Sequence, residues 1–431
     1  MSTTQRAVAV TGLGLTTALG FGVRDNWMAL LAGRSGIVAL PEEAFATPIA
    51  LPVRIGAPVP REALQARIRD AVPRQVWNTS PAVCHLWLLT ALEALAQAGL
   101  WPDLPAGVAP GRVGIYVGNG GGAVDFIEQE FANIYTAEQA VFRDVSRMAV
   151  PKYMTSSLSG QLSIATGLAG PSLTVNTACS SGATALGLAL DALRAGRIDV
   201  AVAGGAELAL SATVLKGFSN LQALTAQPER VAAASRPFDA GRRGFVLGEG
   251  AGCLVLEREQ TARARGRPAL ARLAGSAANS EAHHLLSPRP DGAGMATCIS
   301  AALADAGVAP AAVAHVYAHG TGTADNDRCE AAAIGRVLTG QPTVSATKGL
   351  LGHAIGGAGA IDAVLAVLSL TDGQMVPCVN VEQPDAACPV RLAREPAQSA
   401  LRQPGAAVTV HAFAFGGQNA VLVFQAPSPT V

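Results

Sequence analysis

One cysteine stands where a short apolar run gives way to a helix pattern. Residues 173–175 are apolar, and an Ala- and Leu-rich helix is predicted from Ser181 to Arg194, so Cys179 lies just before a helix N-terminus. Unpaired backbone N–H groups and the helix dipole favour a thiolate at such a place. The four residues after Cys179 are small and leave the sulfur accessible. The residues alone support two interpretations, a nucleophile or a buried structural cysteine.

Two histidines have similarly specific neighbours. His319 opens His-Gly-Thr-Gly-Thr at the end of a predicted strand, and His353 closes Thr-Lys-Gly-Leu-Leu-Gly-His, which contains Lys348. Loops at strand ends often carry binding and catalytic groups. Each histidine by itself is equally compatible with a hydrogen-bonded core residue. The spacing of histidines and cysteines does not match a zinc site, and no third group is placed to orient a Cys–His protease pair.

Composition narrows the class of protein. Half of the 431 residues are apolar, and Lys+Arg and Asp+Glu both number 31, which argues against a nucleic-acid or anionic-membrane surface. Seven cysteines without C-x-x-C pairs favour a reducing compartment over a disulfide framework. Neither a signal-peptide pattern nor an uninterrupted run of about 18 apolar residues is present. The sequence therefore predicts a cytoplasmic protein without a membrane span.

Strand patterns that run into glycines recur along the chain. Val8–Gly14 predicts a strand followed by a glycine turn, but it lacks the G-x-G-x-x-G spacing of a dinucleotide site. A second glycine-rich turn, from Phe245 to Gly252, is predicted to lead into a strand at 253–256. Residues 36–75 show no clear periodicity and predict a surface excursion. The other predicted strands are 112–117, 199–203, 269–276 and 314–318, and the other predicted helices are 80–99, 295–306, 327–338 and 356–370.

The end of the chain repeats an earlier pattern. Ala412–Gln425 and Gly244–Glu257 both read Phe, one residue, an apolar residue, glycines and then a strand. Chance similarity between glycine turns is the competing explanation. The repetition predicts an α/β protein of two related βαβ halves, residues 1–257 and 258–431.

Five motifs in order resemble the β-ketoacyl-acyl-carrier-protein synthases. They are Thr-Ala-Cys-Ser-Ser-Gly, Gly-Phe-Val-Leu-Gly-Glu-Gly-Ala-Gly, Ala-His-Gly-Thr-Gly-Thr, Thr-Lys-Gly-Leu-Leu-Gly-His and Phe-Ala-Phe-Gly-Gly-Gln-Asn. The chain is most similar to the elongating long-chain synthases and the type II polyketide ketosynthases. The resemblance implies a thiolase-like fold with a five-layered αβαβα core. It also implies acyl carrier protein as partner and no cofactor beyond the phosphopantetheine arm of that carrier. A homodimer is expected, with a heterodimer with a related subunit as the alternative.

The resemblance also assigns roles to residues. Cys179 would accept the acyl group, His319 and His353 would stabilise the enolate formed by decarboxylation of malonyl thioester, and Lys348 would order the site. The backbone N–H groups of Cys179 and Phe415 would form the oxyanion hole, and the rings of Phe245 and Phe415 would act as aromatic gates. Binding of the arm or substrate would fall to Thr321, Thr323, Gly121 and Phe413. Glu330 would be a structural carboxylate that could pair with Lys348. No metal site is implied.

Several positions depart from the pattern of the fatty-acid enzymes. Gly121 replaces a bulky aliphatic residue and Ala149 an aromatic one, which predicts a wider or longer acyl pocket. Asn78-Thr-Ser-Pro81 replaces a basic segment near the carrier-protein surface, while Gln222 replaces an arginine and Leu286 a threonine at the arm. Arg243, Asp362 and Gln418 also differ. These departures leave the catalytic groups intact and bear on the carrier and the acyl chain.

The predicted function is decarboxylative Claisen condensation of an enzyme-bound acyl group with malonyl-acyl carrier protein, in a polyketide, polyene or other specialised pathway. Housekeeping fatty-acid elongation is the first alternative. A non-elongating partner subunit and an acyltransferase of the same fold are alternatives of another class.

Overall fold

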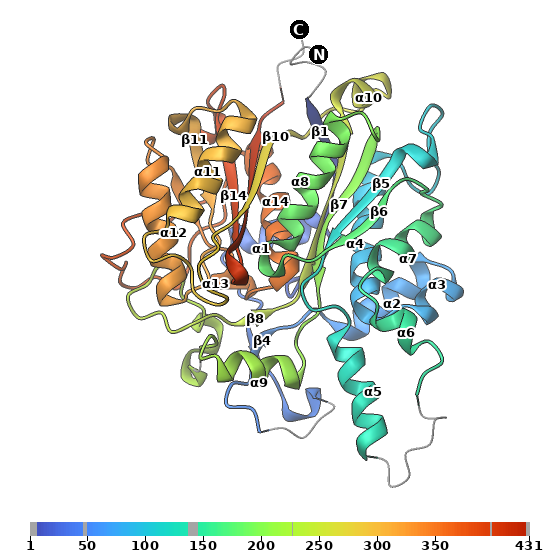
Figure 1. The fold of residues 1–431 in the computed structure, drawn as a ribbon, viewed down its shortest axis with the longest axis horizontal. Coiled ribbons are helices and arrows are strands. Elements are labelled where there is room, and N and C mark those ends of the chain that lie inside the picture. Colours follow the sequence, from blue (N-terminus) through green and yellow to red (C-terminus); the bar gives the residue numbers. More distant parts are fainter. Residues whose placement is uncertain (1–6, 46–49, 137–144, 226, 397–398, 428–431) are drawn as a thin grey trace.

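The computed structural model describes residues 7–45, 50–136, 145–225, 227–396 and 399–427 (Figure 1). Its strands form one long sheet path in the order β13-β12-β11-β14-β15-β10-β1-β9-β7-β5-β6. The N-terminal half contributes β1 (Val8–Thr17), β5 (Val113–Gly118), β6 (Ser172–Val175), β7 (Val200–Glu207) and β9 (Gly250–Arg258). The C-terminal half contributes β10 (Ala271–Ser280), β11 (Val313–Tyr317), β12 (Thr343–Ser345), β13 (Arg391–Leu392), β14 (Ala407–Phe413) and β15 (Gln418–Gln425).

The two halves repeat the same strand connections. β5 pairs in parallel with β6 and β7, and β11 pairs in parallel with β12 and β14. β9 is antiparallel to both β1 and β7, as β15 is to both β10 and β14. The matching sequence segments thus end in strands at equivalent places, β9 and β15. A short antiparallel contact between β1 and β10, at Ala9–Arg272 and Val10–Ala271, joins the halves. The boundary between residues 257 and 258 stays a prediction.

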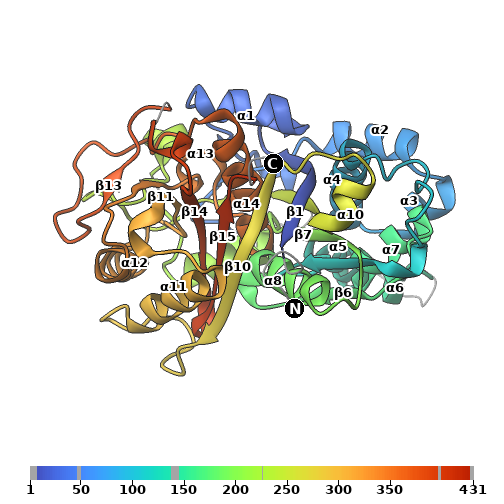
Figure 2. The same ribbon diagram turned by 90° about the horizontal axis from the view of Figure 1, so that it is seen from above.

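Helices separate and cover the two halves of the sheet in five αβαβα layers. The middle layer holds α8 (Ser181–Arg194) and α14 (Ile355–Asp372), which contact each other and strands of both halves. On the outer faces, α4 (Ala82–Ala98) packs on β1 and β9, and α11 (Ala293–Ala306) packs on β10 and β15. Figure 2 shows α8 and α14 between these outer helices. The predicted layering and the predicted helix from Ser181 to Arg194 are confirmed.

The apolar character of α14 follows from its place in the core. Among the described helices, it alone is long and apolar enough to cross a membrane by length and composition. Most of its residues are nevertheless buried between the two halves of the sheet. Its apolarity is that of a core helix.

The predicted glycine turns, one at Gly12 and Gly14 and one from Phe245 to Gly252, are wrong at the glycines that lie inside strands. Gly12 and Gly14 lie inside β1, and Gly250 and Gly252 lie inside β9. A Cβ on Gly14 would come 1.9 Å from the carbonyl oxygen of Thr90 in α4. A Cβ on Gly252 would come 2.5 Å from the carbonyl of Ala360 in α14. These glycines allow helices to pack directly on strands.

The predicted excursion at 36–75 contains regular structure. It holds β3 (Val38–Ala39), β4 (Ile55–Ala57), α2 (Arg61–Ala71) and the start of α3 (Arg74–Thr79), while β4 pairs with β8 (Leu247–Gly248). The helical pattern of α2 is weak because only Leu64 and Ile68 are buried. The remaining elements are β2 (Gly20–Phe21), α1 (Val23–Leu31), α5 (Val124–Thr136), α6 (Ala149–Tyr153), α7 (Ser157–Thr166), α9 (Ala212–Asn220), α10 (Glu259–Ala264), α12 (Ala324–Val337) and α13 (Lys348–Leu351).

Candidate active site

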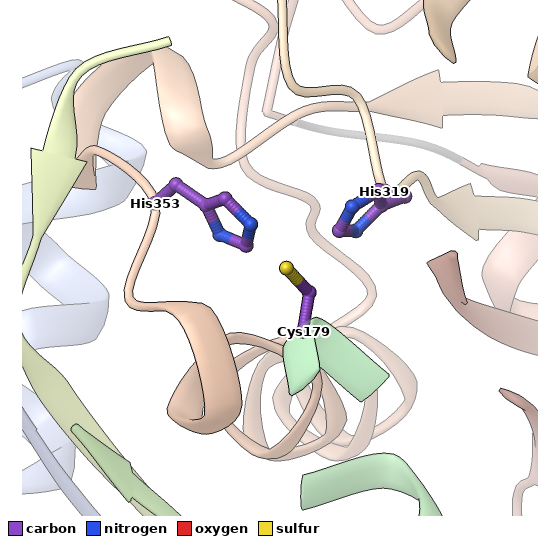
Figure 3. A group of neighbouring side chains, drawn as sticks. All are labelled: Cys179, His319 and His353. Atoms are coloured by element: carbon purple, nitrogen blue, oxygen red, sulfur yellow. The ribbon is translucent and has the colours of Figure 1, made fainter. Parts of the chain in front are cut away.

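Cys179 lies in a single helical turn between β6 and α8. The turn spans Ala178–Ser180, and Ala178 adopts a left-handed φ of 51°, an unfavourable conformation for a residue with a Cβ. Strain of this kind is commonly stored at functional sites. The turn presents the sulfur toward two histidine rings (Figure 3).

Three segments far apart in the sequence bring Cys179, His319 and His353 together. His319 follows β11, and His353 lies between α13 and α14. The sulfur and one ring nitrogen of each histidine lie within 4.8 Å of one another, and the two imidazole rings meet nearly edge-on with centroids 5.2 Å apart. All three side chains are buried. The geometry joins a thiol from one half of the fold to two imidazoles from the other (Figure 3).

Both histidines are held in the neutral form. Burial lowers the pKa of each ring well below its usual range, and the nearby Lys348 ammonium lowers it further. Both ring nitrogens of His353 are buried without a hydrogen-bond partner among the described residues. A buried polar group without a partner is costly, so the His353 ring is arranged to bind something that enters the site.

The expectation of a thiolate at Cys179 is wrong for the structure without ligand. Burial raises the pKa of the thiol to about 12, although Lys348 and the backbone N–H groups of Phe415 and Cys179 act in the opposite direction. Desolvation therefore outweighs the helix N-terminus, and the resting group is a neutral thiol. The same two N–H groups are those predicted to form an oxyanion hole, and both face the sulfur.

Lys348 pairs with Asp362 and not with Glu330, the carboxylate suggested from the sequence. Its Nζ lies 3.7 Å from Asp362 Oδ2, and both side chains are almost fully buried. The hydroxyl of Thr347 also donates to Asp362 over 2.6 Å. Sequence spacing did not reveal this pair because the approach of α13 to α14 depends on the tertiary fold.

Glu330 instead orders the loop that carries His319. From α12, its carboxylate accepts hydrogen bonds from the backbone N–H groups of His319 and Gly320, each over 2.8 Å. His411 Nδ1 lies 3.3 Å from the same carboxylate. The predicted structural place of Glu330 near the site matches these contacts.

A cavity of about 400 Å³ opens at the trio. Thr321 and Thr323 line it, and their hydroxyls hydrogen-bond each other over 2.9 Å. The other site residues predicted from the sequence that line it are Cys179, His319, His353, Phe245, Phe413 and Phe415. Cys179, both histidines and these three phenylalanines thus share one cavity with the two threonines.

Aromatic contacts surround the reactive end of this cavity. Phe245 meets His353 edge-on at 5.2 Å between centroids, and Phe413 faces His319 at 6.3 Å. Phe218 of α9, which sequence reasoning missed, packs on both Phe245 and Phe415. Its signal was weak, since it is one aromatic residue in a short amphipathic helix.

The cavity leaves out one predicted substrate-binding residue, Gly121, and adds others. Gly121 is not among the lining residues, and its N–H donates to the buried Glu207 over 3.1 Å. Glu207 and Ile355 were both missed. Ile355 lines the cavity, and Glu207 could have been noticed as an acidic residue closing an apolar strand. Gln222 and Leu286, two of the departures noted above, do line the cavity.

A thiol and two imidazoles are also a donor set that zinc accepts. The charge already at the site disfavours a cation between these three, because the Lys348 ammonium lies close enough to lower the pKa of both rings. The trio fits acyl-transfer chemistry better than metal binding.

Two family models match the chain in succession. The β-ketoacyl synthase N-terminal domain covers residues 5–262, and the β-ketoacyl synthase C-terminal domain covers residues 270–382. The chain belongs to the β-ketoacyl synthase family. It is an acyltransferase of the ketosynthase type with the thiolase-like fold.

Relatives of this β-ketoacyl synthase come from two kinds of pathway. The 3-oxoacyl-[acyl-carrier-protein] synthase 2 of Coxiella burnetii is 34% identical over 430 residues, which cover 97% of this chain and 98% of the relative. A type II polyketide ketosynthase, solved in complex with its acyl carrier protein and bound to a hexaketide, superposes with a TM-score of 0.87 at 27% identity, covering 98% and 100% of the two chains. The ishigamide ketosynthase/chain length factor gives 0.86 at 29% identity, covering 98% and 100%.

Proposed function

We propose that this β-ketoacyl synthase condenses an acyl group carried on Cys179 with malonyl-acyl carrier protein, releasing CO2 and giving a β-ketoacyl-acyl carrier protein. The single observation that carries the assignment of residues is the buried trio of one thiol and two neutral imidazoles. A thiol can hold an acyl group as a thioester, and neutral imidazole N–H groups can stabilise an enolate oxygen.

In the first half-reaction, the Cys179 sulfur attacks the carbonyl carbon of the incoming thioester. A new C–S bond forms, the bond to the carrier thiol breaks, and the proton of the Cys179 thiol ends on the departing sulfur. The N–H groups of Cys179 and Phe415 stabilise the oxyanion in between. In this scheme the Cys179 thiol loses its proton only after a thioester is bound. The raised pKa of the thiol fits this order, since the thiolate is needed only at that point.

In the second half-reaction, the malonyl thioester loses CO2 and the electron pair of the broken C–C bond becomes an enolate. His319 and His353 donate to the enolate oxygen. The enolate carbon then attacks the acyl carbonyl, the bond to the Cys179 sulfur breaks, and the sulfur takes up a proton. These steps balance without a redox partner, so we propose that no cofactor or metal is needed beyond the arm of the carrier protein.

The test separates the two half-reactions. We expect Cys179→Gln to abolish condensation and to retain malonyl decarboxylation, because the amide imitates the acylated sulfur. His319→Ala and His353→Ala should lose decarboxylation of radiolabelled malonyl-acyl carrier protein, each by about 100-fold or more. Condensation by Cys179→Gln would show that the nucleophile is misassigned. A non-elongating subunit would show no acylation of Cys179, and an acyltransferase would show acylation without CO2 release.

The proposed pathway is specialised rather than housekeeping, and the departures at Gln222 and Leu286, which line the cavity at its mouth, support it. Three exposed leucines lie there, with Leu221 47%, Leu285 72% and Leu286 37% exposed, and Leu221 and Leu286 line the cavity. Incubation with a panel of acyl carrier proteins, read by intact mass spectrometry of Cys179, tests the proposal. Efficient elongation of saturated long chains on a fatty-acid carrier would overturn it.

We propose a homodimer built on β6. The outer edge of β6 has no pairing strand among the described residues, and Leu173 on it is 48% exposed. Ile164 of α7 and Phe131 of α5 add exposed apolar surface. An exposed apolar edge strand favours pairing with another chain.

A cytoplasmic location is proposed because the seven cysteines are all free.

A further inference from the structure

Glu207 is a buried carboxylate that the proposed reaction does not use. It is the last residue of β7 and has no exposed surface. Its two oxygens accept four hydrogen bonds, all from neutral N–H groups, at distances between 2.7 and 3.2 Å. Burying a carboxylate away from water costs free energy. The four hydrogen bonds offset part of this cost.

The four donors come from two separate segments. The N–H groups of Gly120 and Gly121 and the side-chain amide of Asn119 belong to the loop after β5. The N–H of Gly356 belongs to the first turn of α14. The contact between the segments is tight, because a Cβ on Gly356 would come 2.4 Å from the nitrogen of Gly120. Glu207 therefore joins the loop at 118–122 to the start of α14.

Each of these segments is attached to one side of the catalytic trio. The loop at 118–122 holds the turn that carries Cys179, since Asn176 Nδ2 donates to the carbonyl of Gly120 over 3.0 Å and Asn119 N donates to that of Val175 over 3.0 Å. α14 begins two residues after His353, at Ile355, which lines the cavity with a left-handed φ of 35°.

Glu207 also acts on the sulfur through its charge. Burial raises the pKa of Glu207 itself to about 7, so this charge is present above that pH. When ionised, Glu207 raises the pKa of the Cys179 thiol, opposite in sign to Lys348, while His319 and His353 are neutral at the same centre. A carboxylate that braced the two segments from farther away would leave the titration of the nucleophile unchanged. This gives a readout that separates the two roles.

We propose that Glu207 is a positioning residue: it joins the loop that holds Cys179 to the start of α14 and so fixes Cys179 relative to His353. The effect that we expect on condensation rests on the proposed function. Its effect on the thiol can be measured without any substrate.

The experiment compares Glu207→Gln with Glu93→Gln. Glu93 is a matched control because it also accepts hydrogen bonds from two backbone N–H groups, those of Leu15 and Val23, yet its charge is not among those that act on the Cys179 thiol. The first readout is the rate of alkylation of Cys179 by iodoacetamide from pH 6 to 10, with the modified peptide identified by mass spectrometry. The second is condensation under saturating acyl and malonyl carrier thioesters.

In Glu207→Gln we expect alkylation at pH 8 to be faster than in the native protein, because loss of a negative charge that raises the thiol pKa increases the thiolate fraction. We expect kcat for condensation to fall about tenfold or more with little change in KM, because the reacting groups are misaligned. Glu93→Gln should change neither. Glu207→Asp keeps the charge but shortens the side chain, so it should keep the alkylation profile of the native protein and still lose condensation.

An unchanged alkylation profile in Glu207→Gln would overturn the proposal, as would wild-type kcat in both variants. If Glu207→Gln does not fold, Glu207→Asp decides alone: full condensation in that variant contradicts the positioning role. Failure of the native protein to take up an acyl group would refute the proposed function instead, and the alkylation readout would be unaffected.

Discussion

At the scale of single residues, the site depends on neutral groups. Cys179, His319 and His353 are buried together. Burial raises the pKa of the thiol and lowers the pKa of both imidazoles, and both shifts favour the uncharged form. Lys348 supplies the nearby positive charge, balanced by Asp362 over 3.7 Å. The centre is therefore suited to stabilising a negative charge that appears only during the reaction.

The depressed pKa values of the histidines predict an unusual acid tolerance. Neutral imidazole is the active form, and each ring stays neutral until the pH falls well below 6.5. We expect malonyl decarboxylation by Cys179→Gln to stay nearly constant between pH 8 and pH 6. A pH–rate profile checks this, and a loss of activity centred near pH 6.5 would contradict it.

In Lys348→Met, we expect the fall in activity at the acid end of that pH–rate profile to move to higher pH. Removing the ammonium takes away a cause of the low histidine pKa, so protonation begins at higher pH, although burial, the larger cause, remains. We also expect a loss of condensation. If activity fell at the same pH with and without the Lys348 ammonium, the lysine charge would have no effect on protonation of the histidine rings.

Residue identities were largely readable from the sequence, and their surroundings were not. The motifs pointed to Cys179, His319, His353, Thr321 and Thr323, which all line one cavity. The partner of Lys348 and the contacts of Glu207 and Gly121 were missed because they join segments that only the folded chain brings together. The neutral thiol was missed because the sequence reveals the helix N-terminus but not the depth of burial.

At the scale of elements, β1 shows how local patterns mislead. Its Gly-Leu-Gly reads as a turn, yet both glycines extend the strand beneath α4. Similarly, α2 was overlooked because its mean hydropathy is low and only two of its residues are buried. The strongly apolar α8 and α14 were predicted well because their burial matches their composition.

We expect Gly14→Ala to destabilise the fold by about 2–3 kcal/mol, because the new methyl group collides with backbone atoms of α4 and one element must shift. Urea unfolding followed by circular dichroism measures this. Gly160→Ala, in α7 with open space around its Cβ, is the matched control and should be neutral or stabilising. Equal stability of the two variants would contradict the packing argument.

At the scale of the whole molecule, the exposed edge of β6 is the main unexplained surface. We expect Leu173→Lys to weaken the proposed dimer, because a charge on an edge strand opposes pairing. Sedimentation velocity over a range of concentrations checks this. Leu285→Lys, a similarly exposed leucine at the mouth of the cavity, is the control and should leave the oligomeric state unchanged. A native protein that is monomeric at micromolar concentration would refute the proposal.

The short seam between β1 and β10 has a consequence for synthesis of the chain on the ribosome. The nucleophile is translated in the first half, while both histidines, Lys348 and the backbone N–H of Phe415 emerge later. Until the second half docks, the nascent chain holds a thiol without the groups that turn it into a catalyst. Completion of the fold is thus also the moment at which the molecule becomes a catalyst, and we expect a product truncated before His319 to be catalytically inactive.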